Sequence, residues 1–213
     1  MRDYGIRVTG YDEIEAAVRK AVADERVEEI VLNVDSPGGM VRGVMGAARA
    51  VREAADSKQV TVWCDGMCAS AAYWVCCGAF CFLVGPTADI GSIGVYQVWY
   101  DTSGANARYG FRPVVIRSGA HKGMGIDGIT DEQIAAEQEN VDAIAELFKG
   151  AVADGRGLGS EQLEALATGQ TWVGARAVTV GLADRVLETY TVGQIVDDEQ
   201  EINMSEKQTT AVP

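Results

Sequence analysis

The sequence lacks the features that mark a membrane span, a secretion signal or a nucleic-acid surface. No run approaches the roughly 18 to 20 uninterrupted apolar residues of a spanning helix. The first residues lack the basic and then apolar pattern of a signal peptide. With a formal net charge of −13, the chain has no excess of Lys and Arg for binding phosphates. We therefore expect a cytoplasmic protein with no membrane anchor and no nucleic acid as partner.

Histidine and cysteine are scarce, and their placement excludes further classes of site. The chain has one histidine, and its five cysteines all lie between Cys64 and Cys81 without forming a Cys-x-x-Cys pair. Zinc ligation therefore has little support, and we expect no metal and no cofactor. We expect free thiols packed as small apolar side chains. One alternative stays open, that Cys68 is itself a nucleophile.

The chain does contain a regular alternation of helix and strand patterns. Hydrophobic residues make up 47% and charged residues 23% of the chain, which suits a packed core. Apolar spacing predicts helices and short β-branched runs predict strands. The predicted helices cover residues 11–23, 40–55, 70–77, 102–109, 131–153, 160–167 and 174–180. The predicted strands or extended segments cover residues 29–35, 60–63, 80–84, 93–100, 113–116 and 183–187. This alternation indicates an α/β domain.

Cap residues and composition set the expected boundaries. Thr130 and Ser160 precede helical patterns and are predicted N-caps. After Leu187 the pattern fades into an acidic run and a polar end. We therefore expect a single domain over residues 1–191 and a disordered tail over residues 192–213.

Three segments carry the parts of an acyl-transfer site. A double-glycine turn, Gly38-Gly39, follows a predicted strand, Ser70 begins a helix of small residues, and Lys122 lies on a glycine-containing loop. A hydroxyl, an amine that acts as base and outward-facing backbone N–H groups are what a serine–lysine site needs. Each part also has a plainer interpretation, namely a tight turn, an N-cap and a solvated charge.

Two adjacent residues, Lys122 and His121, are candidates for the general base. Lys122 can accept a proton from Ser70 only in its neutral form, which an amine reaches when burial disfavours the charge. His121 is adjacent, and neighbours on an extended loop point in opposite directions, so both cannot easily face one serine. A Ser-His-Asp triad through His121 remains the alternative. Its candidate carboxylates are Asp35, Asp89 and Asp127.

Taken in order along residues 11–187, these segments resemble the S49 family of serine–lysine peptidases. This is the signal peptide peptidase A type within the ClpP/crotonase-like superfamily. The segments that carry the resemblance are Val34 to Gly39, Ala69 to Trp74, Ala88 to Val95, Ile116 to Lys122, and Gly169 to Asp184. The resemblance implies an α/β fold of the ClpP/crotonase-like ββα superhelix type, here lacking the first strand or strands.

The resemblance also implies a role for each candidate residue. Ser70 is the implied nucleophile and Lys122 the implied general base. The implied oxyanion hole comprises Gly38, Gly39 and the amide of Ala71. The implied substrate is an extended polypeptide and the implied assembly a homo-oligomer. One departure is that Ala71 and Ala72 stand where the signal-peptide enzymes usually have two glycines after the serine.

The compact single-copy layout most resembles the phage head maturation proteases of the same family. That resemblance implies a serine endopeptidase that processes scaffold, portal or coat proteins inside a procapsid in the host cytoplasm. The alternatives are a bacterial cytoplasmic S49 peptidase that degrades signal peptides or other peptides, a crotonase-type enzyme acting on acyl-CoA, and a catalytically inactive assembly module.

Overall fold

The computed structural model describes residues 8–188, so the predicted tail over residues 192–213 lies outside them. The chain packs as two compact units, which divide at residues 93/94 and 148/149. The first unit includes Ser70 and the second unit, residues 94–148, includes Lys122. No helix within residues 8–188 is both long enough and apolar enough to cross a membrane.

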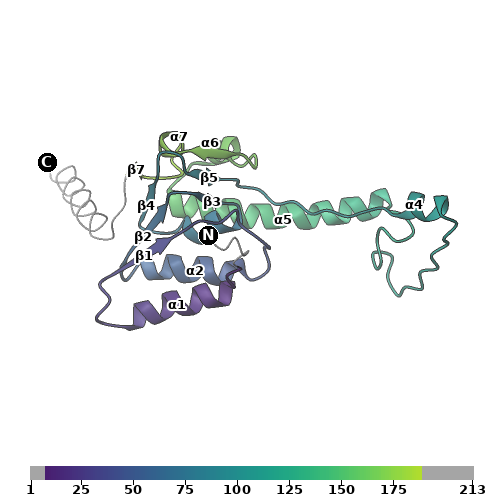
Figure 1. The fold of residues 1–213 in the computed structure, drawn as a ribbon, viewed down its shortest axis with the longest axis horizontal. Coiled ribbons are helices and arrows are strands. Elements are labelled where there is room, and N and C mark those ends of the chain that lie inside the picture. Colours follow the sequence, from purple (N-terminus) through teal and green to yellow (C-terminus); the bar gives the residue numbers. More distant parts are fainter. Residues whose placement is uncertain (1–7, 189–213) are drawn as a thin grey trace, which may run out of the picture. The chain divides into compact units, whose positions relative to one another are not determined.

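Two sheets form the centre of the first unit (Figure 1). The larger sheet is parallel with strand order β1-β2-β4-β7, and the smaller has the order β3-β5-β6. In the larger sheet Ile30 pairs with Val60 and Val62 pairs with Phe82, and all four side chains are buried. The strands are β1 (Glu29–Asn33), β2 (Gln59–Cys64), β3 (Met67–Ala69), β4 (Cys81–Val84), β5 (Asp89–Gly91), β6 (Thr171–Val173) and β7 (Arg185–Val186).

The chain passes repeatedly from the larger sheet into the smaller one. After β1, Ser36 forms a parallel bridge to Cys68 of β3. In the same way β2 leads into β3, and β4 leads into β5. Helix α2 (Val44–Ala55) follows the first of these pairs and helix α3 (Ala71–Cys76) the second. This strand–strand–helix order is the ββα arrangement that the sequence predicted.

Small residues bring the helices of the first unit close together. Helix α1 (Tyr11–Ala23) has the predicted bounds and packs along α2, which in turn packs on α3. Figure 1 shows α1 and α2 side by side. Ala47, Ala50 and Ala54 of α2 are buried and leave room for their neighbours. The unit also contains α6 (Ser160–Leu166), α7 (Ala175–Thr179) and the end of α5 (Asp131–Arg156).

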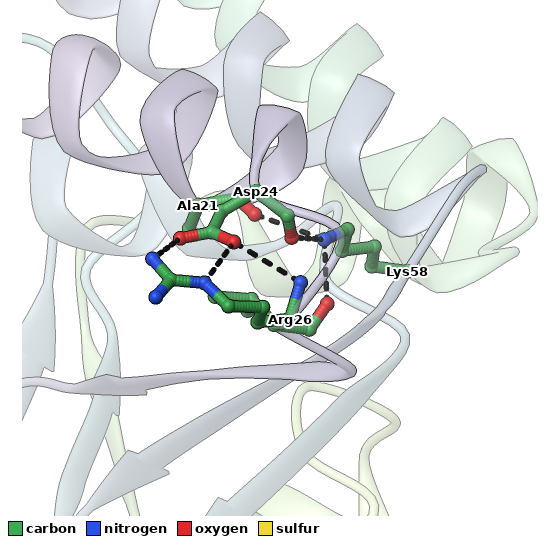
Figure 2. Close-up of polar contacts among 5 residues, drawn as sticks. Ala21, Asp24, Arg26 and Lys58 are labelled. Carbon is green, nitrogen blue, oxygen red and sulfur yellow. Dashed lines mark hydrogen bonds and ion pairs between the residues drawn. The ribbon is translucent and has the colours of Figure 1, made fainter.

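Lys58 closes the C-terminal end of α1. Its Nζ donates to the carbonyl oxygens of Ala21, Asp24 and Val27 at 3.0, 2.7 and 2.5 Å. Figure 2 shows the ammonium group directed at these oxygens, with Arg26 paired to the Asp24 carboxylate. The last carbonyls of a helix have no partner within it, so a cation placed here satisfies them.

One predicted helix start and one predicted cap are wrong, and in both cases a glycine occupies the cap position. Helix α2 begins at Val44 rather than at residue 40, because Gly43 has a φ of 91° that no helix residue adopts. Ser160 is the first residue of α6 and not its cap, since Gly159 occupies the cap position with an extended backbone.

The second unit holds α4 (Ser103–Arg108) and the first part of α5. The predicted cap of α5 is confirmed, because Gln133 N donates to Thr130 Oγ1 at 3.2 Å. The predicted strand over 113–116 is wrong, since it joins no sheet within residues 8–188. Its β-branched residues favour an extended backbone, but a strand also needs a partner. Ile116 is instead 95% exposed.

Candidate active site

Ser70 lies at a sharp change of backbone direction between β3 and α3. Its φ of 53° and ψ of −128° fall where a side chain is strongly disfavoured. The backbone is held there from both sides: Ser70 N donates to Gly91 O at 2.7 Å, and Trp74 N donates to Ser70 O at 3.0 Å. Such strain costs about 1 to 3 kcal/mol and clusters at functional sites. The conformation therefore marks Ser70 as a candidate functional residue.

The hydroxyl of Ser70 is not used as a helix cap. The residue occupies the cap position of α3, but its side chain makes no capping hydrogen bond. Within residues 8–188, Ser70 Oγ has no hydrogen-bond partner, and the residue is partly exposed while Ala71 is buried. The N-cap interpretation thus accounts for the position of Ser70 and leaves its hydroxyl free to react.

The double-glycine turn approaches the serine closely. Gly38 has a φ of 100°, and a Cβ at this position would lie 2.7 Å from Ser70 Cβ and 2.9 Å from Ala71 N. Only glycine fits such a point. At Gly39 an added Cβ would meet only the Tyr11 hydroxyl, at 3.6 Å. The structure therefore brings together Gly38, Ser70 and Ala71, with Gly39 next in the chain.

The same two segments supply unpaired backbone donors. Gly38 N donates to Ser36 Oγ at 3.2 Å, so its N–H is already engaged. In the described part of the chain, the N–H groups of Gly39 and Ala71 have no acceptor. Backbone N–H groups are rarely left unpaired, and free donors beside a hydroxyl suit the binding of an oxyanion. Of the three residues predicted for the oxyanion hole, Gly39 and Ala71 fit as donors. Gly38 has no free N–H, but its lack of a side chain lets the turn come close to Ser70.

A second serine shares the strained conformation, and sequence reasoning did not single it out as a site residue. Ser70 and Ser92 are the non-glycine residues with positive φ in the described chain. Ser92 directly follows Gly91, whose carbonyl accepts the Ser70 N–H, and its own N donates to Gln170 O at 2.8 Å. Backbone dihedral angles leave no trace in a sequence, so only the surrounding Ile-Gly-Ser-Ile-Gly motif pointed to this region.

The cysteines are free and buried, which confirms the prediction. Burial raises the pKa of Cys68 well above its ordinary value, and it raises the pKa of Cys64 and of Cys77 to about 12. The thiolate is the nucleophilic form of cysteine, so Cys68 is a poor alternative to Ser70. Within residues 8–188, no three His, Cys, Asp or Glu side chains are grouped to hold a metal ion.

Lys122 and His121 lie in the second unit, on the loop that follows Arg117. Both side chains are exposed in the single chain, and Lys122 N donates to Gly119 O at 3.0 Å. An ion pair between Arg117 and Asp127 closes this loop. The burial that a neutral lysine requires is thus absent from the single chain as described.

The carboxylates predicted to orient His121 are all engaged elsewhere. Asp127 is bound by Arg117, which lowers the pKa of that carboxyl. Asp35 accepts the Met67 N–H at 3.2 Å, and Asp89 accepts the Thr171 hydroxyl at 3.4 Å. A carboxylate accepts more than one hydrogen bond, so these contacts do not decide against the triad, which remains the alternative to the Ser70–Lys122 dyad.

One family model and several known proteins are similar to this chain in sequence. A model of Peptidase family S49 matches residues 52–203. The head-tail preconnector protein GP5 of Enterobacteria phage P21 is 32% identical over 84% of this chain, and the capsid assembly protease C of Escherichia phage lambda is 32% identical over 85%. Protease 4 of Salmonella typhi is 30% identical over 82%. The chain spans 36%, 42% and 29% of these relatives' own lengths.

A solved structure supports the fold alone. A ClpP1 mutant from Listeria monocytogenes has a TM-score of 0.56 to this chain, with 13% sequence identity and 84% of each chain covered. Together with the ββα order of the two sheets, this likeness confirms the predicted ClpP/crotonase-like fold.

Proposed function

Because the chain belongs to peptidase family S49, we propose that it is a serine endopeptidase with Ser70 as nucleophile and Lys122 as general base. The observation that carries the proposal is the held, strained conformation of Ser70, whose hydroxyl has no other use in the described chain. The close approach of Gly38 and the unpaired N–H groups of Gly39 and Ala71 support it.

In the proposed reaction, Ser70 Oγ attacks the carbonyl carbon of the scissile peptide. Neutral Lys122 takes the hydroxyl proton and then donates it to the leaving amine, so the acyl group stays on Ser70 as an ester. In the second half, water attacks the ester carbon while neutral Lys122 takes a proton from the water. The bond to Ser70 Oγ then breaks, Lys122 returns the proton to that oxygen, and the acid is released. The N–H groups of Gly39 and Ala71 bind the oxyanion in both steps, where each such donor contributes about 3 kcal/mol.

We propose that the active species is a homo-oligomer in which the second unit supplies a contact surface. Among the described residues, eleven of sixteen exposed large hydrophobic side chains belong to this unit. Tyr96, Tyr100 and Phe111 are 87%, 79% and 70% exposed. A second copy covering this surface would also enclose the Lys122 loop and disfavour the charged amine.

Charge within the second unit supports a second copy as the partner. Residues 102–126 contain four Lys and Arg residues and no Asp or Glu, whereas residues 131–148 contain six Asp and Glu residues and no Lys or Arg. The basic segment of one copy therefore complements the acidic part of α5 of another.

The phage relatives support a narrower substrate class, namely scaffold, portal or coat proteins processed during head assembly. One relative is named a capsid assembly protease and another a head-tail preconnector protein. The similarity to Protease 4 of a bacterium supports the second candidate, a bacterial peptidase that degrades signal peptides or other peptides.

An active-site probe tests the core of the proposal. A fluorophosphonate reagent should label the purified protein on Ser70, located by peptide mass spectrometry, and block cleavage of an unfolded protein substrate. Co-expression with phage head proteins and with a signal peptide then separates the two substrate classes. Absence of labelling in an assembled, folded sample would favour the inactive assembly module.

A further inference from the structure

Gln133 lies in the first turn of α5 and uses both ends of its side-chain amide. Its Oε1 accepts the Thr130 N–H at 3.1 Å, and its Nε2 donates to the carbonyl oxygen of Ala120 at 2.7 Å. The residue is only 5% exposed, and apart from Thr61 it is the only buried polar residue in the described chain. Capping a helix needs the first bond alone, so the second bond has a separate purpose.

The second bond fixes the loop that carries Lys122. Ala120 is two residues before the lysine, and its carbonyl also accepts a weaker bond from Arg117 Nη1 at 3.4 Å. Arg117 in turn pairs with Asp127, and Lys122 N donates to Gly119 O. These contacts are local to the loop. After Lys122, the loop is also tied to residues 102–106, because Thr102 N and Oγ1 donate to Gly125 O and Asn106 Nδ2 donates to Ile126 O. Before Lys122, the bond from Gln133 ties the loop to the long helix.

We propose that Gln133 is a positioning residue for Lys122, an inference that rests on the proposed function. Lysine carries its amine on a flexible stem with four carbons, so the backbone anchor decides where the amine can reach. A displacement of about 1 Å remote from the reacting atoms can lower a rate about 100-fold. Gln133 acts by holding the Ala120 carbonyl, and it does not touch the substrate.

The decisive variant is Gln133→Glu. A glutamate keeps the acceptor for the Thr130 N–H, and Glu is itself a favoured partner at this capping position. Its second oxygen, however, faces the Ala120 carbonyl in place of a donor. We expect kcat to fall about 10- to 100-fold while KM changes less than about 3-fold, because the base is misplaced while Gln133 itself does not touch the substrate.

Three further variants separate positioning from helix capping and from charge. Thr130→Ala removes the hydroxyl that caps α5 but leaves the Gln133–Ala120 bond, and it should keep a kcat close to that of the wild type. Gln162→Glu adds the same charge and loses an amide-to-carbonyl bond of the same kind, to Val180 O, at an exposed site outside the second unit, and it should stay active. Gln133→Met lacks the donor without adding charge, and it should lose kcat as Gln133→Glu does. Circular dichroism confirms that each variant is folded.

Limited digestion with trypsin gives a readout that is independent of the protein's own activity. The bond after Lys122 should be cut faster in Gln133→Glu and in Gln133→Met than in the wild type, and at the wild-type rate in Thr130→Ala. Equal loss of kcat in Thr130→Ala and Gln133→Glu would overturn the inference in favour of capping. So would a wild-type kcat in Gln133→Glu beside an inactive Lys122→Ala. Full activity of Lys122→Ala would instead refute the proposed base, and this inference with it.

Discussion

Gly38 and Ser70 are packed so tightly that a Cβ on the glycine would lie 2.7 Å from the serine Cβ. Both residues have positive φ, at 100° and 53°. Two turns with positive φ, one after β1 and one before α3, thus meet at a single point. Any side chain at position 38 must push the turns apart, so the shape of the glycine turn and the geometry of the candidate nucleophile are coupled.

This coupling predicts different outcomes at the two neighbouring glycines. Gly38→Ala should destabilise the fold by about 1 to 3 kcal/mol, because it forces a contact and a strained φ. It should also lower kcat by at least about 100-fold. Gly39→Ala should be tolerated in both respects, since an added Cβ there meets only Tyr11. Urea unfolding and steady-state kinetics on both variants decide the point. An inactive Gly39→Ala beside an active Gly38→Ala would contradict it.

Ser70 should be essential for activity and costly for stability. Ser70→Ala should abolish cleavage, since removing a nucleophile lowers rates by about six orders of magnitude. Ser70→Gly should be equally inactive yet about 1 kcal/mol more stable, because glycine relieves the strain at a φ of 53°. Thermal unfolding compares the two variants, with Ser92→Gly as the matched control at the other strained serine. Wild-type cleavage by Ser70→Ala would move the nucleophile elsewhere.

The identity of the base can be tested by substitution at two adjacent positions. Lys122→Ala and Lys122→Arg should both be inactive, because arginine stays protonated and cannot accept the serine proton. His121→Ala should keep most of its activity. An inactive His121→Ala together with an active Lys122→Ala would support the triad instead.

The proposed assembly predicts a charge dependence. Arg108→Glu combined with Arg112→Glu should weaken self-association, measured by light scattering, because the basic segment then repels the acidic part of α5. The second double variant, Glu137→Lys with Glu139→Lys, should also weaken self-association when it is the only species in solution. Mixing the two double variants should restore the oligomer, since opposite charges meet again. A stable, active monomer of the unmodified protein would refute the assembly.

Buried thiols predict a loss of stability at alkaline pH. The pKa of Cys64 and of Cys77 rises from an ordinary 9.0 to about 12 in the folded protein. The folded state therefore holds these protons more tightly, so their contribution is complete below pH 9 and is lost between about pH 9 and 12. In that window each buried thiol lowers the free energy of unfolding by up to about 1.4 kcal/mol per pH unit. Urea unfolding at pH 8 and 10 measures the fall, and Cys77→Ala should reduce it.

The longer elements of the fold were predictable because their patterns are local. The apolar spacing around Ile14 and Val18 gives α1 its observed bounds, and the Thr130 cap marks the start of α5. The strands β3, β5 and β6 have three residues each, which is too short for any period to show. The segment around Ile116 has strand composition without a strand partner, and pairing is a property of the whole chain.

Some residues of the candidate site can be proposed from sequence and others cannot. Motifs point to Ser70 and Lys122, since hydroxyls and amines are visible in a sequence. The sequence did not show which glycine of the turn must be a glycine, because φ at Gly38 depends on contact with a segment more than thirty residues away. Nothing in the sequence distinguishes Gln133 from the other polar residues of α5, and only its buried bond to Ala120 does so.

The three carbonyl oxygens bound to Lys58 Nζ affect how this lysine reacts in chemical footprinting. The three hydrogen bonds use all three protons of its ammonium group, on carbonyl oxygens in the last turn of α1 and just beyond its end, as Figure 2 shows. An acylating reagent can reach that amine only after the end of α1 has opened. The rate at which Lys58 is acylated, relative to the exposed Lys20 on the same helix, therefore reports how often α1 detaches from the rest of the first unit.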